Sequence, residues 1–219
     1  MSDPGQIGTT EAPGAGAGML FDSHVHFGDS VNGVEAVLCR AAAAGVGQMA
    51  AVGHDADANR LALVLAGSYP RRIVAAVGYD RDQTAILETL PAALDGLAEQ
   101  IRLARESGAH VGAIGEIGLD FHYSRETRCE QLALLRRQLE LARSLRLPVI
   151  VHSREAESET IRELARHAES WRGPADRLGV LHCFTGSRDF ARELTACGYY
   201  VSFSGIVTFR NASDLRKVV

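Results

Sequence analysis

The feature of this chain that most constrains its fold is a recurring pair: an apolar, strand-like run followed by a side chain that binds metals. His24 and His26 close the first such run, and Glu116 lies at the end of a later one. His152 and His182 close two more. Helical stretches separate the runs, and in a parallel barrel the carboxyl ends of the strands meet at one face. The pattern predicts a parallel barrel with a metal site at that face.

Strand and helix patterns alternate along the chain at the spacing of βα units. Strands are predicted at 19–26, 48–52, 73–77, 111–117, 147–152, 178–182 and 199–203. Helices are predicted at 34–44, 58–68, 90–106, 125–145, 155–168 and 187–196, and 211–219 resembles the opening of another, with Ser213 a candidate N-cap. A complete barrel of this type has about 250 residues. The expected fold is therefore an α/β, TIM-type (β/α)8 barrel, incomplete at about seven βα units and open at its first and last strands.

Residues 1–18 differ in composition from the rest and are rich in Gly, Ala, Pro and Thr. They lack the basic and apolar regions of a signal peptide, so we expect a disordered leader. We expect residues 19–219 to form one barrel domain that carries the metal site and is truncated at its C-terminus. No run is long and apolar enough to cross a membrane, and the four scattered cysteines predict reduced thiols in a cytoplasmic protein, expected to be a monomer.

The charge of the chain limits how it can bind nucleic acid. A formal net charge of −4 argues against binding nucleic acid by electrostatics alone. It does not exclude a nuclease, because bound divalent cations supply positive charge locally.

The pair His24 and His26 is the first candidate ligand set. Side chains two apart on a strand share one face, so both imidazoles can chelate one divalent ion. Asp22 shares their phase and can orient a histidine as a carboxylate behind the ligands. A solitary pair of this kind is more often a surface feature, and the matching strand ends elsewhere favour the metal interpretation.

Glu116 lies between glycines inside an apolar run, where a carboxylate must be paired or bound to a metal. One glutamate can bridge two cations, and a core ion pair is the alternative. Asp120 is in phase with Glu116 and either supports a ligand or caps the following loop.

His152 closes an apolar strand, and Arg154 lies one step nearer the mouth of the barrel. A guanidinium there suits a phosphate oxygen, although a salt bridge to Glu155 or Glu157 explains Arg154 equally well. His182 closes the next strand. Its place in the series favours a ligand over a buried structural histidine.

The remaining reactive side chains fit the pattern less well. Cys183 follows His182 in the opposite phase, which favours packing over nucleophilic chemistry. His54 and His122 follow strand ends and can line the mouth, without a predicted ligand role. His110 and His167 are expected to be solvated.

Together these motifs resemble those of the TatD family of metal-dependent deoxyribonucleases, within the amidohydrolase-like barrels. The matching stretches are 21–26, 115–120, 147–154, 182–187 and 202–209. The resemblance implies two-metal hydrolysis of phosphodiester bonds, often as a 3′–5′ exonuclease, with DNA or another phosphodiester as substrate.

The resemblance also implies roles for individual residues. His24 and His26 would hold one divalent ion, Glu116 would bridge, and His152 and His182 would hold the second. The metals are open between zinc, manganese, magnesium and cobalt. Glu116 and Arg154 are the predicted catalytic residues, with Arg154 stabilising charge on the phosphate.

Two departures from the family pattern stand out. After the third strand the family often has Gly-x-His-Pro, where this chain has Gly78-Tyr79-Asp80-Arg81. The family also has an eighth-strand aspartate that helps to activate water, and Asp214, in a helical stretch, does not replace it. Two alternatives therefore stay open. One is a hydrolase of the same fold acting on a C–N, ester or phosphotriester bond, and the other is a truncated, inactive metal-binding or interaction protein.

Overall fold

The computed structural model describes residues 19–28 and 33–219. The leader predicted at 1–18 lies outside these residues.

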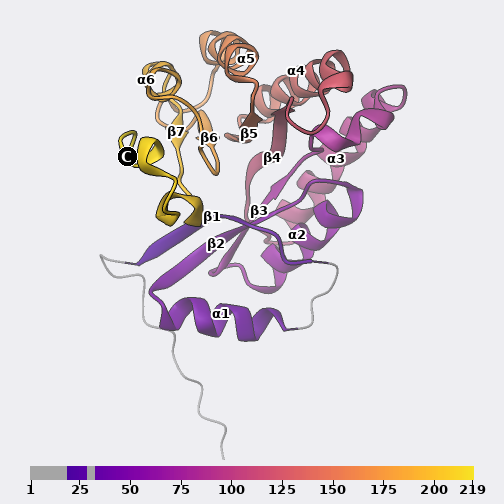
Figure 1. The fold of residues 1–219 in the computed structure, drawn as a ribbon. Helices are drawn as coiled ribbons and strands as arrows, with labels where there is room; N and C mark the ends of the chain where they lie inside the picture. The colour runs from indigo at the N-terminus through magenta and orange to yellow at the C-terminus, as the bar shows by residue number, and fades with distance from the viewer. Residues whose placement is uncertain (1–18, 29–32) are drawn as a thin grey trace, which may run out of the picture.

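A single sheet of parallel strands forms the centre of the molecule (Figure 1). Its strands follow one another in chain order, from β1 at one edge to β7 at the other. They are β1 (Leu20–Val25), β2 (Val46–Val52), β3 (Ile73–Val77), β4 (Val111–Asp120), β5 (Val149–Arg154), β6 (Gly179–Leu181) and β7 (Tyr200–Val201). The sheet curls so that its inner face is concave, as the predicted open (β/α) barrel requires (Figure 1).

Helices connect successive strands and cover the outer, convex face of the sheet (Figure 1). They are α1 (Val34–Ala43), α2 (Ala56–Ser68), α3 (Leu90–Glu106), α4 (Arg128–Leu145), α5 (Glu157–Ser170) and α6 (Arg188–Ala196). A last short helix, α7 (Ser213–Arg216), follows β7. Short 3₁₀ turns occur at η1 (Arg81–Ile86), η2 (Arg125–Thr127) and η3 (Gly205–Thr208). None of the helices in the described ranges has the length and apolar character needed to cross a membrane.

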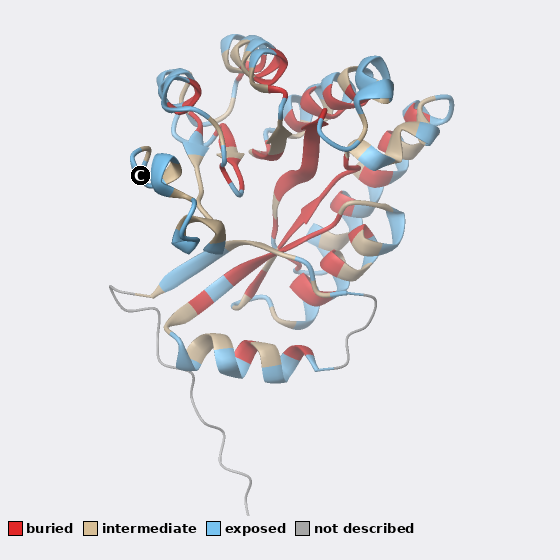
Figure 2. Ribbon diagram, viewed as in Figure 1, coloured by how far each residue is buried: buried red, intermediate tan, exposed pale blue. Residues whose placement is uncertain are grey.

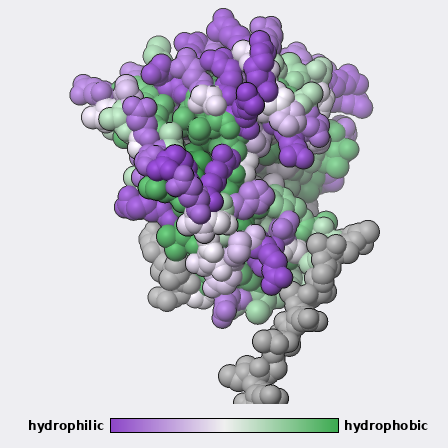
Figure 3. All heavy atoms as spheres, turned by 180° about the vertical axis from the view of Figure 1, so that it is seen from behind, coloured by the Kyte–Doolittle hydropathy of each residue, from purple (hydrophilic) through white to green (hydrophobic). Residues whose placement is uncertain are grey.

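The main core lies between the sheet and the helices, where the buried residues in Figure 2 face one another. Leu135 of α4, Ile114 of β4 and Leu164 of α5 are fully buried there. Each such side chain contributes about 1.5–3 kcal/mol through burial. A smaller cluster of Ala and branched residues lines the concave face. Seen from behind, polar residues cover most of the surface and apolar ones gather in patches between them (Figure 3).

Local sequence explains where several helices begin. The carboxylate of Asp55 accepts hydrogen bonds from the backbone N–H groups of Asp57 and Ala58, which caps α2. Ser187 caps α6 in the same way. The prediction that Ser213 is an N-cap is wrong by one position. Ser213 is the first residue of α7, and Ala212 occupies the N-cap position.

An irregularity in β4 decides which of its side chains reach the inner face of the sheet. Between Ile114 and Ile117, β4 advances three residues while β5 advances two, from Val149 to Val151. The extra residue is a bulge, and it leaves Ile114 and Ile117 both in the outer core. Glu116 therefore turns to the concave side.

Candidate metal centre

The five predicted ligands converge at the C-terminal end of the curled sheet. His24 belongs to β1, Glu116 to β4 and His152 to β5. His26 and His182 each follow the last residue of a strand, β1 and β6 respectively, by a single position. The chain thus brings together side chains that lie as far apart in sequence as 24 and 182.

Glu116 is the centre of this group and is 4% exposed. Its Oε2 lies 3.2 Å from Nε2 of His24 and 3.4 Å from Nε2 of His26. Its Oε1 lies 3.3 Å from Nε2 of His182 and 3.5 Å from Nδ1 of His152. Four imidazoles therefore surround one carboxylate, two on each oxygen.

Close approach of β4 to β5 makes this arrangement possible. A Cβ on Gly115 would lie 2.7 Å from Cβ of Ile150, and one on Gly118 would lie 2.1 Å from the carbonyl oxygen of His152. Gly118 also has a φ of +145°, which side chains rarely adopt. Glycine is therefore required at positions 115 and 118, on either side of the pair formed by Glu116 and Ile117.

The hydrogen bonds of two imidazoles fix which nitrogen carries the proton. Nδ1 of His26 lies 2.9 Å from the carbonyl oxygen of Val52, which can only accept, so Nδ1 donates. Nε2 of His152 lies 3.0 Å from Oδ2 of Asp120 and donates in the same way. In a neutral ring the other nitrogen carries a lone pair. In both residues that nitrogen faces Glu116.

A divalent cation fits this donor set. Lone pairs that face a carboxylate repel it unless positive charge lies between them, and Nε2 of His24 is only 3.0 Å from Nε2 of His26. Nε2 of His182 is buried and has no hydrogen-bond partner among the described residues. Ligand atoms of His24, His182 and Glu116 all lie within 4.8 Å of one another. Imidazole and carboxylate ligands are typical of metal centres. In such centres the second ring nitrogen of a ligating histidine commonly donates to a carbonyl or a carboxylate.

The electrostatics of the centre keep the carboxylate charged. Burial opposes ionisation of Glu116, but the surrounding imidazoles hold its pKa well below the usual range. Burial lowers the pKa of His24 and of His152, which favours the neutral rings that bind metals. The pKa of His26 is raised, mainly by its contact with Glu116.

Asp120 both supports a predicted ligand and caps a loop. Its Oδ2 accepts from the ring of His152, while its Oδ1 accepts from the backbone N–H groups of His122 and Tyr123 at 3.0 Å each. These contacts outweigh the effect of burial and lower the pKa of Asp120. The side chain of Gln131 bonds the Asp120 backbone on both sides, which holds the carboxylate in place.

Asp22 does not orient an imidazole, contrary to the predicted phase. Its Oδ1 accepts from the backbone N–H of His24 at 3.1 Å, and the ring Nδ1 of His24 has no hydrogen-bond partner in the described part of the chain. The register of β1 shifts between Asp22 and Val25. Asp22 pairs with Met49, which belongs to the outer core, and the shift separates its face from that of His24.

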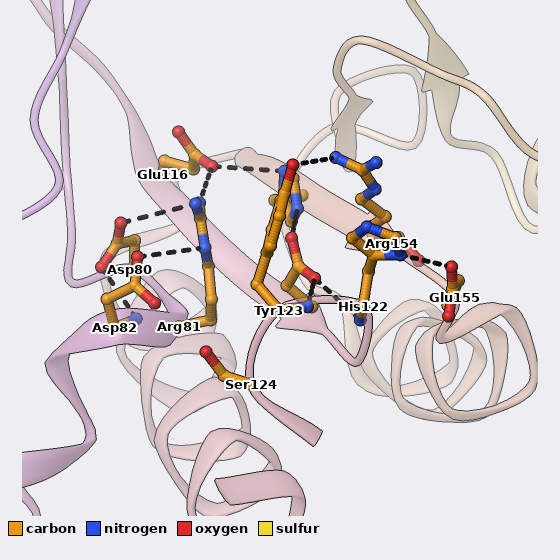
Figure 4. A network of polar contacts seen from close by, with 12 residues as sticks. Asp80, Arg81, Asp82, Glu116, His122, Tyr123, Ser124, Arg154 and Glu155 are labelled. Carbon is orange, nitrogen blue, oxygen red and sulfur yellow. Dashed lines mark hydrogen bonds and ion pairs between the residues drawn. The ribbon is translucent and has the colours of Figure 1, made fainter. Parts of the chain in front are cut away.

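Arg154 lies at the mouth without either of the predicted salt bridges (Figure 4). Its guanidinium lies 4.7 Å over the ring of Tyr123 and donates to the Tyr123 hydroxyl at 3.2 Å. Glu155 instead pairs with His122 at 2.6 Å, and Glu157 accepts hydrogen bonds at the start of α6. Stacking on an exposed tyrosine holds the guanidinium at the open end of the site.

The loop after β3 supplies two residues that the sequence interpretation did not assign to the site. Asp80 is 7% exposed, and burial raises its pKa. Nη1 of Arg81 lies 3.1 Å from Oε1 of Glu116 (Figure 4). The departure from the family pattern at 78–81 was the available signal, although it did not predict this contact.

A cavity of about 360 Å³ adjoins the centre on the side of His26. His54 lines it, as its position after a strand predicts, and the His54 ring lies edge-on to that of His26 with centroids 5.2 Å apart. Asp55 and Asp57 add polar atoms, and apolar residues of α2 complete the wall.

Three further predictions are tested by burial. His167 is 4% exposed and bonds the Tyr199 hydroxyl at 2.6 Å, so the prediction that it is solvated is wrong, whereas His110 is exposed as predicted. Cys183 is exposed rather than packed. A fourth prediction is tested by pairing: Asp214 of α7 pairs with Lys217, which follows the helix, and does not enter the site, as expected.

The fold and the donor set define a hydrolase-type metal barrel. The model for TatD related DNase matches residues 21–219, and the chain belongs to this family. An uncharacterized metal-dependent hydrolase of Bacillus subtilis, YabD, is 34% identical over 205 residues, which cover 92% of this chain and 74% of YabD. The 3′-5′ ssDNA/RNA exonuclease TatD of Cronobacter sakazakii is 34% identical over 186 residues, 84% of this chain and 65% of that protein.

A solved structure shares the fold. The crystal structure of YjjV, a TatD homolog from Escherichia coli K12, superposes with a TM-score of 0.73 at 35% identity and covers 90% of this chain and 73% of that one. The chain thus spans about two thirds to three quarters of the length of these relatives. It is a TatD family metal-dependent hydrolase, as its motifs predict.

Proposed function

We propose that this hydrolase cleaves phosphodiester bonds of single-stranded nucleic acid from the 3′ end. The observation that carries the proposal is the convergence of four imidazoles on the buried carboxylate of Glu116. A relative described as a 3′-5′ ssDNA/RNA exonuclease supports the choice of substrate. DNA is the substrate that the family resemblance predicts.

We assign the donors to two cation positions, which the two-metal prediction requires. His24, His26 and Oε2 of Glu116 would hold one divalent ion, and His152, His182 and Oε1 would hold the other. Divalent cations supply a water whose pKa is lowered towards neutral, together with positive charge for the leaving oxygen.

The protein's own groups orient the ligands and bind the substrate. Asp120 holds the His152 ring with Nδ1 towards the centre, and the Val52 carbonyl does the same for Nε2 of His26. Arg154 has five N–H donors, and its guanidinium makes a single hydrogen bond among the described residues. The remaining donors would bind a phosphate oxygen at the mouth, where Tyr123 holds the guanidinium by stacking.

The test is the release of nucleotides from single-stranded DNA labelled at either end, with Mn²⁺ or Mg²⁺. We expect mononucleotides to leave the 3′ end, and no release with EDTA or from a Glu116→Gln preparation. Parallel assays on a carboxylic ester and a phosphotriester separate the alternative chemistry. Turnover of those esters with intact DNA would contradict the proposal, as would release that survives the chelator.

A further inference from the structure

Arg81 places a permanent positive charge inside the metal centre. It is the first residue of η1, directly after the β3 loop, and its side chain is 22% exposed. Its Nη1 lies 3.1 Å from Oε1 of Glu116 and 3.6 Å from Oδ2 of Asp80, and its Nε lies 3.4 Å from Oδ2 of Asp82 (Figure 4). A guanidinium is not deprotonated in proteins, so this charge persists at any working pH.

The loop that carries Arg81 is fixed on both sides. The side chain of Asn59 bonds the N–H and the carbonyl of Gly78, and that of Gln138 bonds both backbone groups of Tyr79. Asp80 donates its backbone N–H to the carbonyl of His54. These buried bonds hold the base of the Arg81 side chain close to β4, so its contact with Glu116 belongs to the fold rather than to a free surface chain.

The two oxygens of Glu116 therefore differ. Oε2 meets only imidazoles, those of His24 and His26, among the contacts of the described residues. Oε1 meets the imidazoles of His152 and His182 and also the Arg81 guanidinium.

A cation bound at Oε1 would share that oxygen with a like charge. Repulsion between like charges a few ångströms apart is strong in a partly buried site, and the guanidinium already satisfies part of the charge of the oxygen. No comparable penalty applies at Oε2.

We propose that Arg81 takes the charge position of a second cation, so that the chain binds one divalent ion tightly at Oε2 and a second only weakly at Oε1. The inference rests on the proposed function in one respect, namely that the centre binds divalent cations at all. It makes Arg81 a positioning residue that sets the metal stoichiometry of this chain.

The test is calorimetric titration of the chelator-treated chain with Mn²⁺, comparing wild type with Arg81→Gln. We expect one tight equivalent in wild type and two in the variant, with the second binding more than about tenfold more tightly than in wild type. Arg154→Gln is the matched control, because it removes a guanidinium from the mouth that does not contact Glu116, and it should leave one tight equivalent. Electron paramagnetic resonance should show coupled Mn²⁺ pairs in the Arg81 variant at metal concentrations where wild type shows isolated ions.

Each outcome decides a different point. Two equally tight equivalents in wild type would overturn the inference, and so would one tight equivalent in both proteins, since Arg81 would then not be the cause. The single equivalent retained at Oε2 shows that the variant is folded at the centre. No Mn²⁺ binding by folded wild type would overturn the proposed function itself and the inference with it.

Discussion

Two buried glutamates in this molecule have opposite surroundings. Glu116, 4% exposed, faces four imidazoles at the end of the barrel. Glu163, 3% exposed, lies on the outer helix α5, where Arg136 binds both of its oxygens at 2.7 and 2.9 Å. Arg162 and Arg166 lie 3.2 and 3.5 Å away.

The difference shows how the partners of a buried carboxylate indicate its role. Arginines carry the compensating charge themselves, so Glu163 is complete as a structural ion pair. Imidazoles, unlike guanidinium groups, carry no permanent charge, so Glu116 retains charge that a divalent cation can balance. Arg81 supplies only part of that balance, and only at Oε1.

The largest expected effect separates the two glutamates by activity. Glu116→Gln keeps the shape of the side chain but removes the charge, so we expect hydrolysis of single-stranded DNA to fall about 10³-fold or more. Glu163→Gln, far from the centre, should retain wild-type activity per folded molecule. Rates under saturating Mn²⁺ measure both, and equal losses would contradict the comparison.

His167, a buried histidine outside the metal centre, should make the stability of the protein depend on pH. Burial, followed by the charge of Arg143, lowers the pKa of His167 from 6.5 to about 4. Between these values the unfolded chain binds a proton and the native chain does not. The contribution of His167 to the free energy of unfolding is therefore fully present above pH 6.5. It falls by about 3 kcal/mol as the pH drops towards 4.

Urea unfolding between pH 4.5 and 7.5 measures this effect. His167→Gln should remove that part of the pH dependence, and the difference between the two proteins isolates it from other titrating groups. Parallel pH profiles in wild type and variant would show that His167 is not responsible.

Stabilisation of the protein by metal should depend on Glu116. At about 100 times its dissociation constant, a ligand bound by the native state alone raises the free energy of unfolding by about 2.7 kcal/mol. We expect this from Mn²⁺ in wild type and in Glu163→Gln, with reversal by EDTA. Thermal unfolding measures it, and an equal rise in Glu116→Gln would mean that the stabilising ion binds elsewhere.

The smallest effect concerns the outer ion pair. Arg136→Met leaves Glu163 buried but still close to Arg162 and Arg166, so we expect a loss of about 1–2 kcal/mol in the free energy of unfolding. DNA hydrolysis should be unchanged. Urea titration gives the first quantity, and a loss of activity in fully folded protein would place this α4–α5 ion pair in the catalytic machinery.

The sequence predicts the alternating architecture and the meeting of the five candidate ligands. It does so because apolar runs with a polar end place their last side chains at one face of a parallel sheet. The positions of His152 and His182 in the site are predicted directly by that rule.

The remaining features depend on geometry that periodicity does not carry. A shift of register in β1 separates Asp22 from His24, and only the packed loop after β3 brings Arg81 to Glu116. The burial of His167 results from the packing of α5 against Tyr199, a residue distant in sequence. Such contacts arise between elements rather than within them.

Anomalous diffraction from crystals soaked in Mn²⁺ would test the central claim most directly. We expect an ordered ion beside Oε2 of Glu116, between the imidazoles of His24 and His26, and a peak of lower occupancy on the Oε1 side. Ordered Mn²⁺ at other positions, with no anomalous peak beside Glu116, would contradict it.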